Sequence, residues 1–396
     1  MSCCKVVIPL LFPNSLNRLE NLQLAASHKI SKQNWCRCRS LPILAFSIVM
    51  VCNPLRAYNW SNDYGVDLTA GYHDNIDLSV DDEIDTSSGA VGVFADIEGT
   101  TEISSIRLGL ALTGTTYSDS SLDDETAYNL SLDTSNSGER IASFFSLLLD
   151  REATRETEQL DSEFDARDGT RDSVTFTPSL SYEVDETNSI VAGFSFQDVS
   201  YDTNANTDYT DKSISLSWVH QLNEASSIST NFQFAEYDPD DDDTSDTNSV
   251  NVGYDYRASE ATSYYFSMGY TKVDEPDGSS DGGTGAFAVN HQTDERNNFS
   301  LSLSKDYQAS GDGDVSDEDR LNLGWNHELS ERAQFTLSTE VASRDDTDYY
   351  SFEVGSSYQY TPETALSASY RYRGREEDSD DANSSSILFS LSYSPI

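Results

Sequence analysis

Residues 58–396 of this chain lack cysteine and long hydrophobic runs. All five cysteines lie in the first 57 residues, at positions 3, 4, 36, 38 and 52. The remainder therefore has neither a disulfide framework nor a cysteine metal site. No apolar run after residue 57 is long enough to cross a bilayer as a helix, and the mean hydropathy of the chain is −0.54. This excludes a helical membrane protein.

Basic side chains are also scarce. The chain has 24 Lys and Arg against 69 Asp and Glu, and residues 1–57 hold seven of the basic residues and one of the acidic ones. Residues 58–396 thus carry 17 basic and 68 acidic side chains, a net charge of −51. Proteins that bind nucleic acid need a basic surface for phosphate contacts, so a general nucleic-acid binder is excluded.

The first 57 residues have the order of a secretory signal. Arg37 and Arg39 precede the apolar run Leu41–Val51, and the small residue Ala57 follows. A basic segment, a short apolar segment and a small residue at the cleavage point are typical of a signal peptide. We predict that residues 1–57 are an N-terminal extension plus signal peptide and that residues 58–396 form a single exported domain.

The segment 214–237 shows the pattern on which that domain is built. Bulky side chains occupy every second position from Ile214 to Leu222, and Ile228, Phe232 and Phe234 share a face in the same way with Thr230 among them. Most of the residues between them are Ser, Asn or Gln. Period-two alternation on both sides of a short polar turn predicts a β-hairpin with one apolar and one polar face.

This hairpin recurs along the chain. Turn glutamates follow one another at intervals of 38, 36, 35, 36 and 32 residues, at positions 186, 224, 260, 295, 331 and 363. A period near 35 residues is also found in solenoids and propeller blades. Here each period holds two long strands with a short turn at one end and an acidic connection at the other, which predicts a transmembrane antiparallel up-and-down β-barrel with short periplasmic turns and long acidic extracellular loops.

We count eighteen strands, with sixteen as the alternative. The weakest strand is 285–292, and the Gly-rich segment 277–285 before it is interpreted as a flexible loop tip. An even strand number places both ends of the barrel on the periplasmic side.

Aromatic residues and histidines cluster on the apolar face next to the short turns. We predict a girdle at the membrane interface formed by Trp218, His220, Trp325, His327, Tyr256 and Tyr360. A catalytic role for these histidines would need a nearby nucleophile and acid, and no such local signature is present. The sequence predicts no enzyme activity, no cofactor and no metal site at these positions.

The polar face is predicted to enclose an aqueous lumen, because a barrel of sixteen to eighteen strands is wide enough for one. Arg107, Arg257, Arg371 and Arg373 are the candidate pore-lining residues. They could tune ion selectivity, as charged rings do in channels. Cross-strand ion pairs with neighbouring carboxylates are an equally open interpretation.

The acidic connections include Asp238–Asp243 and Glu376–Asp381. Such runs form a solvated surface. They could also collect divalent cations or bridge to anionic lipopolysaccharide through them, because hard cations prefer carboxylate oxygens.

The final strand carries apolar residues at alternate positions, Ile387-x-Phe389-x-Leu391-x-Tyr393. Together with the signal and the repeated hairpins, it resembles the outer-membrane β-barrel porins of Gram-negative bacteria, some of which accompany exopolysaccharide-biosynthesis operons. The resemblance covers residues 58–396. It implies an outer-membrane location with lipid and lipopolysaccharide contacts, insertion by the barrel-assembly machinery through the C-terminal strand, and a passive pore for small solutes, ions or saccharides. A non-conducting structural or adhesive barrel is the alternative.

Overall fold

The computed structural model describes residues 58–80, 83–157, 169–203, 206–240, 243–275, 278–309, 315–344, 347–377 and 380–395. The chain divides into two units, Met1–Arg56 and Ala57–Ile396, and the described residues belong to the second. The predicted signal peptide and all five cysteines lie outside the described residues and are not tested.

The second unit is built from long strands. In its first half these are β1 (Asn59–Asp74), β2 (Thr86–Thr100), β3 (Ser104–Tyr117), β4 (Glu125–Ser137), β5 (Ile141–Ala153), β6 (Thr170–Glu183), β7 (Asn188–Tyr201), β8 (Tyr209–Asn223) and β9 (Ser226–Pro239). The second half contains β10 (Ser245–Ser259), β11 (Thr262–Glu275), β12 (Gly278–Asp294), β13 (Asn297–Ala309), β14 (Val315–Ser330), β15 (Ala333–Arg344), β16 (Thr347–Thr361), β17 (Thr364–Glu377) and β18 (Asp380–Tyr393).

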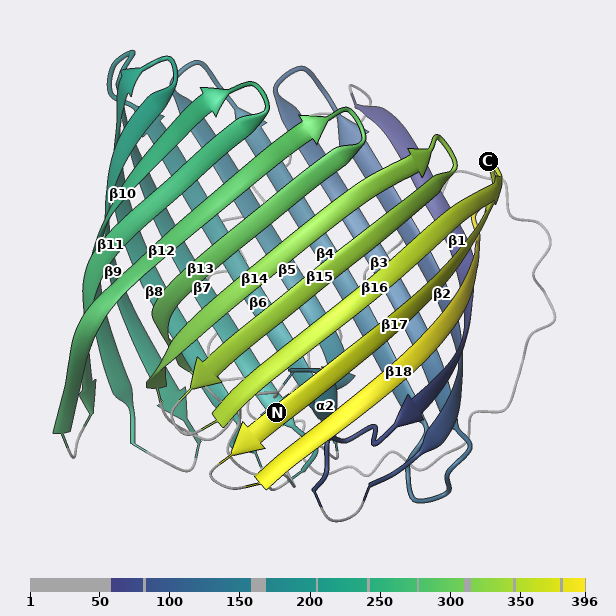
Figure 1. The fold of residues 1–396 in the computed structure, drawn as a ribbon. Coiled ribbons are helices and arrows are strands. Elements are labelled where there is room, and N and C mark those ends of the chain that lie inside the picture. The colour runs from purple at the N-terminus through teal and green to yellow at the C-terminus, as the bar shows by residue number, and fades with distance from the viewer. Residues whose placement is uncertain are drawn as a thin grey trace, which may run out of the picture. The chain divides into compact units, whose positions relative to one another are not determined.

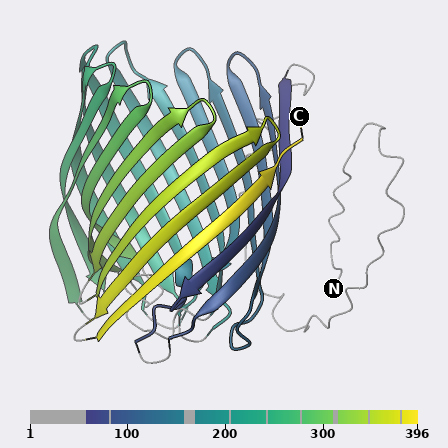
Figure 2. The same cartoon turned by 45° about the vertical axis from the view of Figure 1, so that its right-hand side comes forward.

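Each strand pairs antiparallel with its neighbours in sequence, and β18 pairs with β1, which closes the sheet (Figures 1 and 2). In the closing seam Val66 lies opposite Tyr393 and Asp74 lies opposite Ser385. Closure leaves no sheet edge exposed to lipid. The predicted eighteen-strand up-and-down barrel is confirmed, and the alternative of sixteen strands is wrong.

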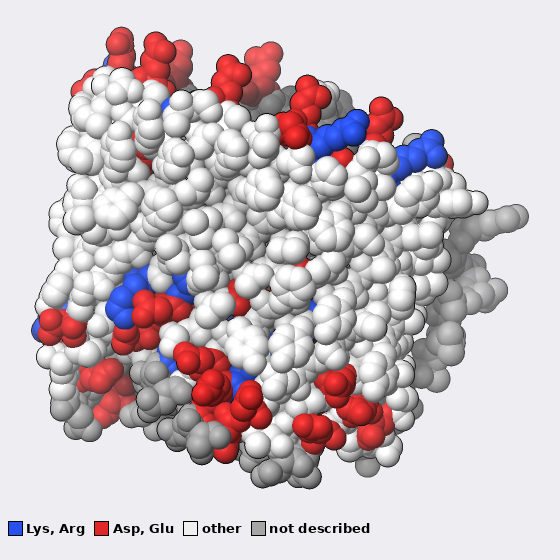
Figure 3. Space-filling view, in the orientation of Figure 1, with Lys and Arg blue, Asp and Glu red and all other residues white. Residues whose placement is uncertain are grey.

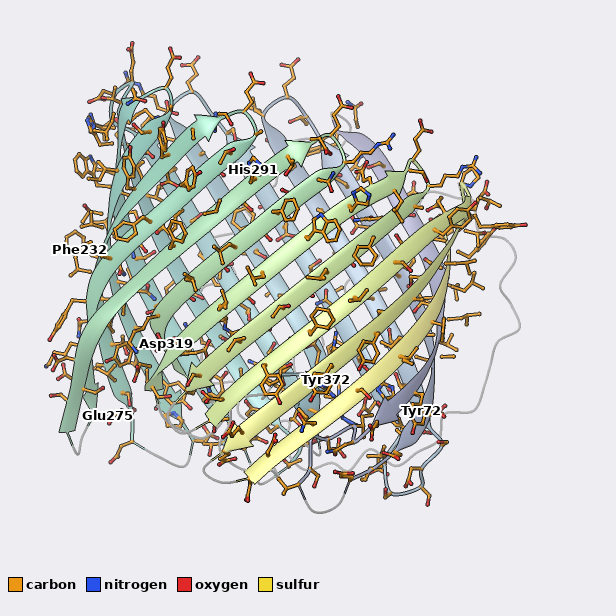
Figure 4. All side chains as sticks on the ribbon, in the orientation of Figure 1. Tyr72, Phe232, Glu275, His291, Asp319 and Tyr372 are labelled. Carbon is orange, nitrogen blue, oxygen red and sulfur yellow. The ribbon has the colours of Figure 1, made fainter. Side chains whose placement is uncertain are left out.

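The alternation of the sequence sets the two faces of the wall. On β8 and β9 the bulky residues point outward and are exposed, with Phe232 56% exposed. Figure 4 shows Phe232, Tyr72 and Tyr372 projecting away from the wall. The side chains between them, such as Ser217 and Asn231, face inward and bond to each other at 2.7 Å. This arrangement suits a bilayer outside and water inside.

Charged residues mark the borders of the outer apolar band. Toward the long connections, ion pairs on the outer face join Lys212 to Glu236 and Lys305 to Asp319. Figure 3 shows charged groups gathered at the two ends of the wall, with an uncharged band between them. Toward the short turns, the band on β8 ends near Leu222. At 3.3 Å per residue and a 45° tilt, the ten residue steps from Lys212 to Leu222 rise about 23 Å, close to the apolar height of transmembrane barrels.

The Gly-rich segment is not a loop tip. Residues 278–285 form the first half of β12 and pair with β11, from Gly278 opposite Glu275 to Gly285 opposite Met268. Glycine supplies the same backbone donors and acceptors as any residue, so the ladder forms although the side-chain alternation is missing. Other strands also extend beyond their predicted ends into acidic sequence, as β18 does by starting at Asp380.

The one helical element among the described residues is α2 (Thr154–Thr157), a single turn that follows β5. Within the described part of the chain, no helix is long and apolar enough to cross a membrane.

Candidate functional site: the lumen and its long-connection mouth

The β1–β2 connection folds inward at the mouth formed by the long connections. Asn75 fixes this bend, because its amide donates to the carbonyl oxygens of Ser79 at 2.8 Å and Asn383 at 3.1 Å. Asn75 and Leu78 have positive φ angles of 50° and 54°. Leu78 is 1% exposed and packs with residues on the inner wall, Ala342, Tyr349 and Ala382. The connection is therefore anchored to β15, β16 and β18 by a small apolar core.

A second inward segment is α2. Its Arg155 pairs with Glu125 and with Asp77, at 3.4 Å for Asp77, and lies 5.4 Å from the centre of the Tyr117 ring. Arg155 is 5% exposed. Buried charges are stable only when paired, so these contacts fix α2 against β3, β4 and the β1–β2 connection.

Glu156 extends from α2 to β17 on the other side of the mouth. Its carboxylate accepts hydrogen bonds from Arg371 at 3.1 Å and from Arg373 at 3.2 Å. Arg371 also donates to Glu353 at 3.0 Å, and Arg373 donates to the carbonyl oxygen of Ile76 at 3.0 Å. Arg373 thus joins both inward segments to the wall.

Further arginines continue this network on the inner wall. Glu318 accepts from Arg320 at 2.7 Å and from Arg344 at 2.9 Å, and Arg320 also pairs with Glu340. Arg375 and Glu377 pair at 2.6 Å. The mouth network, as defined here, consists of Arg155, Arg320, Arg344, Arg371, Arg373 and Arg375 with Asp77, Glu125, Glu156, Glu318, Glu340, Glu353 and Glu377.

Positive and negative groups in the mouth network nearly balance, with six arginines and seven carboxylates in contact. Beside it lies a cavity of about 770 Å³, lined among others by Glu156, Arg320 and Arg371. A space of this size is in the range of small-ligand pockets. Its wall carries donors and acceptors together, which suits passage of hydrated polar solutes.

The predicted pore-lining arginines all lie on strand positions that face inward. Arg371 and Arg373 belong to the mouth network, whereas Arg107 lies toward the short turns and pairs with Asp96 at 2.8 Å. Arg257 lies near the short-turn end of β10. The structure therefore brings together two of the four. Arg107 and Arg371 pair with Asp96 and Glu353 on neighbouring strands, whereas Arg373 pairs with Glu156 on α2. The effect of these arginines on transport stays a prediction.

Sequence reasoning missed the other members of the network. Arg320, Arg344 and Arg375 stand at inward positions in the alternation, so the period-two pattern could have identified them. Glu156 carried no such signal, because nothing in the local sequence indicates that its connection turns inward.

The predicted girdle residues lie on the outer face next to the short turns. They are Trp218, His220, Tyr256, Trp325, His327 and Tyr360. Trp218 is 45% exposed and its ring stacks on His220, with 5.7 Å between the ring centres. Within the residues that the structure describes, no group of three or more His, Cys, Asp or Glu side chains is placed to hold a metal ion.

No family model matches the chain, and no curated protein matches it. Solved structures with a similar fold include the outer membrane protein OpdK from Pseudomonas aeruginosa (11% identity, TM-score 0.47), which covers 85% of this chain and 99% of its own. OccAB1 from Acinetobacter baumannii is 12% identical with a TM-score of 0.43, over 85% of this chain and 97% of its own. OccK2 from Pseudomonas aeruginosa, solved with glucuronate, is 12% identical with a TM-score of 0.47, over 85% and 99%. Sequence identities of 11–12% and TM-scores below 0.5 give no information about the substrate of this chain.

Proposed function

We propose that residues 58–396 form a passive, water-filled pore in the outer membrane of a Gram-negative bacterium. The observation that carries this proposal is the closed barrel with an apolar outer band and a polar inner wall. An interior lined with hydroxyl, amide and paired charged groups suits small hydrophilic solutes.

The charge balance in the mouth network favours weak ion selectivity with a preference for cations. The arginines are matched by carboxylates, so they leave little positive potential in the passage. The acidic groups at the long-connection end then set the sign of the field. This polar lining would also admit saccharides. We include saccharide passage in the proposal because some of the porins that the sequence resembles accompany exopolysaccharide-biosynthesis operons.

The test is conductance of the purified barrel in a planar lipid bilayer. We expect stable single-channel steps and, in a KCl gradient, a reversal potential of the sign given by K⁺ passing faster than Cl⁻. Liposome swelling with neutral mono- and disaccharides would measure whether sugars also pass. A folded barrel that inserts without conducting would overturn the pore and favour the structural or adhesive alternative.

That alternative would use the acidic connections to bind partners, lipopolysaccharide or divalent cations. It predicts Ca²⁺-dependent adhesion of whole cells that is lost when the connections are shortened. In either case we propose that the C-terminal strand, which forms the β1–β18 seam, is the segment read by the barrel-assembly machinery.

A further inference from the structure

Two copies of one side-chain arrangement lie on the outer face at the short-turn end. The turns before β7 and β13 read Asp185-Glu-Thr-Asn188 and Asp294-Glu-Arg-Asn297, and the following strands β8 and β14 carry Trp218-x-His220 and Trp325-x-His327. The register places Asn188 directly opposite His220, and Asn297 directly opposite His327. We name these residues the first module (185, 188, 218, 220) and the second module (294, 297, 325, 327).

The hydrogen bonds of the first module fix the orientation of its asparagine. The Asn188 amide nitrogen donates to both carboxylate oxygens of Asp185, at 2.8 and 2.9 Å. The Asn188 oxygen then faces the indole nitrogen of Trp218 at 3.2 Å and Nδ1 of His220 at 3.0 Å. Because an ionised carboxylate can only accept, the amide cannot be reversed.

The second module repeats this geometry. The Asn297 nitrogen donates to Asp294 at 2.9 and 2.8 Å. The Asn297 oxygen lies 3.3 Å from the Trp325 indole nitrogen and 2.8 Å from Nδ1 of His327. The repeat occurs on strands far apart in the sheet, so it is not a product of one local packing arrangement.

This geometry selects one form of each histidine. An amide oxygen can only accept, so Nδ1 must carry the proton and donate it. In the neutral ring Nε2 is then a fixed acceptor. Each histidine ring also lies against an indole, with centres 5.7 Å apart in both modules. An acceptor nitrogen with an adjacent indole is complementary to a cation that carries N–H donors.

The position of the modules indicates where that cation comes from. They lie at the end of the apolar outer band, where aromatic residues meet lipid headgroups. Asp and Glu outnumber Lys and Arg along this rim of the barrel (Figure 3). An acidic rim repels anionic headgroups and attracts the ammonium of a zwitterionic one.

We propose that each module binds the headgroup of a phospholipid that carries a primary ammonium, with an ammonium N–H donating to Nε2 of His220 or His327 and the positive charge held near the indole. The barrel thus has two specific sites for phosphatidylethanolamine in the leaflet next to the short turns. This inference does not depend on whether the lumen conducts.

The experiment is native mass spectrometry of the full-length folded barrel from nanodiscs at about pH 8. We expect two retained phosphatidylethanolamine molecules per barrel, and roughly tenfold weaker retention of phosphatidylcholine, whose trimethylammonium has no N–H to donate. His220→Phe and His327→Phe should each remove one lipid, and the double variant should remove both.

His291 provides the matched control. Its Nδ1 lies 2.8 Å from the Thr262 hydroxyl at the same level of the barrel, but the residue two positions earlier is Val289 instead of tryptophan. His291→Phe should keep both lipids. Equal retention of phosphatidylcholine, preference for phosphatidylglycerol, or equal loss in His291→Phe would overturn the proposal. Asn188→Val, which frees the His220 ring while leaving the ring present, should also lose one lipid if His220→Phe does not fold.

Discussion

At the scale of single residues, the mouth of the barrel is a set of compensated charges. Arg373 is almost fully buried, yet it contacts a carboxylate on α2 and a backbone carbonyl in the β1–β2 connection. Removing one partner from such a pair leaves a charge without its partner, which costs more than the pair contributes. Replacing a single charged side chain of the mouth network should therefore change the local stability and the electrostatic potential of the mouth.

Glu156→Gln tests this compensation. The variant keeps the size of the side chain and removes the negative charge between Arg371 and Arg373. In a partly aqueous passage, the Coulomb energy between one charge and an ion about 6 Å away is about 1 kcal/mol. Removing this charge should therefore lower the K⁺/Cl⁻ permeability ratio about threefold to tenfold. Reversal potentials in a KCl gradient measure this ratio.

Asp319→Asn is the control for that experiment, because Asp319 lies at the same end of the barrel and pairs with Lys305 on the outer face (Figure 4). Its permeability ratio should equal that of the wild type. An unchanged ratio in Glu156→Gln, or an equal change in both variants, would contradict the assignment of Glu156 to the ion path.

Asp185 gives a pH-dependent prediction in a short turn. Hydrogen bonds from the Thr187 backbone, and from the side chains of Asn188 and Thr187, lower the pKa of Asp185 from 3.8 to about 2. A carboxyl whose pKa is lowered on folding stabilises the fold above its ordinary pKa, and this stabilisation is lost as the pH falls toward 2. Asp185→Asn should therefore unfold at a lower temperature than the wild type near neutral pH.

The difference in unfolding temperature should shrink below about pH 4 and vanish only below about pH 2, where Asp185 is protonated in the folded barrel as well. Heating followed by gel electrophoresis, in which folded and unfolded barrels migrate differently, measures it. A difference that persists unchanged at the lowest pH would show that the turn depends on the shape of Asp185 and not on its charge.

At the scale of elements, the apolar contacts of the inward β1–β2 connection centre on one fully buried leucine, Leu78. Leu78→Ala should cost about 2–4 kcal/mol of local stability, because it removes buried methyl groups and leaves a cavity. The freed connection should raise the single-channel conductance and the current noise while the strands stay paired. Leu216→Ala, on the lipid-facing side of β8, should leave both unchanged. A current with the noise and conductance of the wild type in Leu78→Ala would show that the polar contacts of Asn75, Asp77 and Arg373 are enough to hold the connection.

The elements also show what the sequence could and could not predict. The alternation of apolar and polar side chains was enough to predict the strands around Phe232 and Phe389. A strand with an apolar outer face and a polar inner face needs this alternation because successive side chains point to opposite faces. The alternation failed at 278–285, where glycines pair through the backbone without side chains that could alternate. It could not place Glu156 beside Arg371, since a contact across the lumen between residues 215 positions apart leaves no local pattern.

At the scale of the whole molecule, the net charge of −51 in residues 58–396 makes the pore sensitive to salt. Ions screen exposed charges over about 10 Å at 0.1 M and about 3 Å at 1 M. The cation preference should therefore be strongest below 0.1 M KCl and should weaken by 1 M. Reversal potentials at a constant concentration ratio and rising absolute concentration would measure it. A preference that does not change with concentration would place its origin in the narrow mouth network, where the charges are less screened.

The pairing of β1 with β18 has a consequence for how the molecule is made. Seventeen of the eighteen strand pairings join strands that follow one another along the chain, and one joins the first strand, β1, to the last, β18. Biosynthesis must therefore deliver the last residues before the cylinder can be completed. Until then the first and last strands each present a row of backbone donors and acceptors without partners, which is costly wherever lipid reaches them.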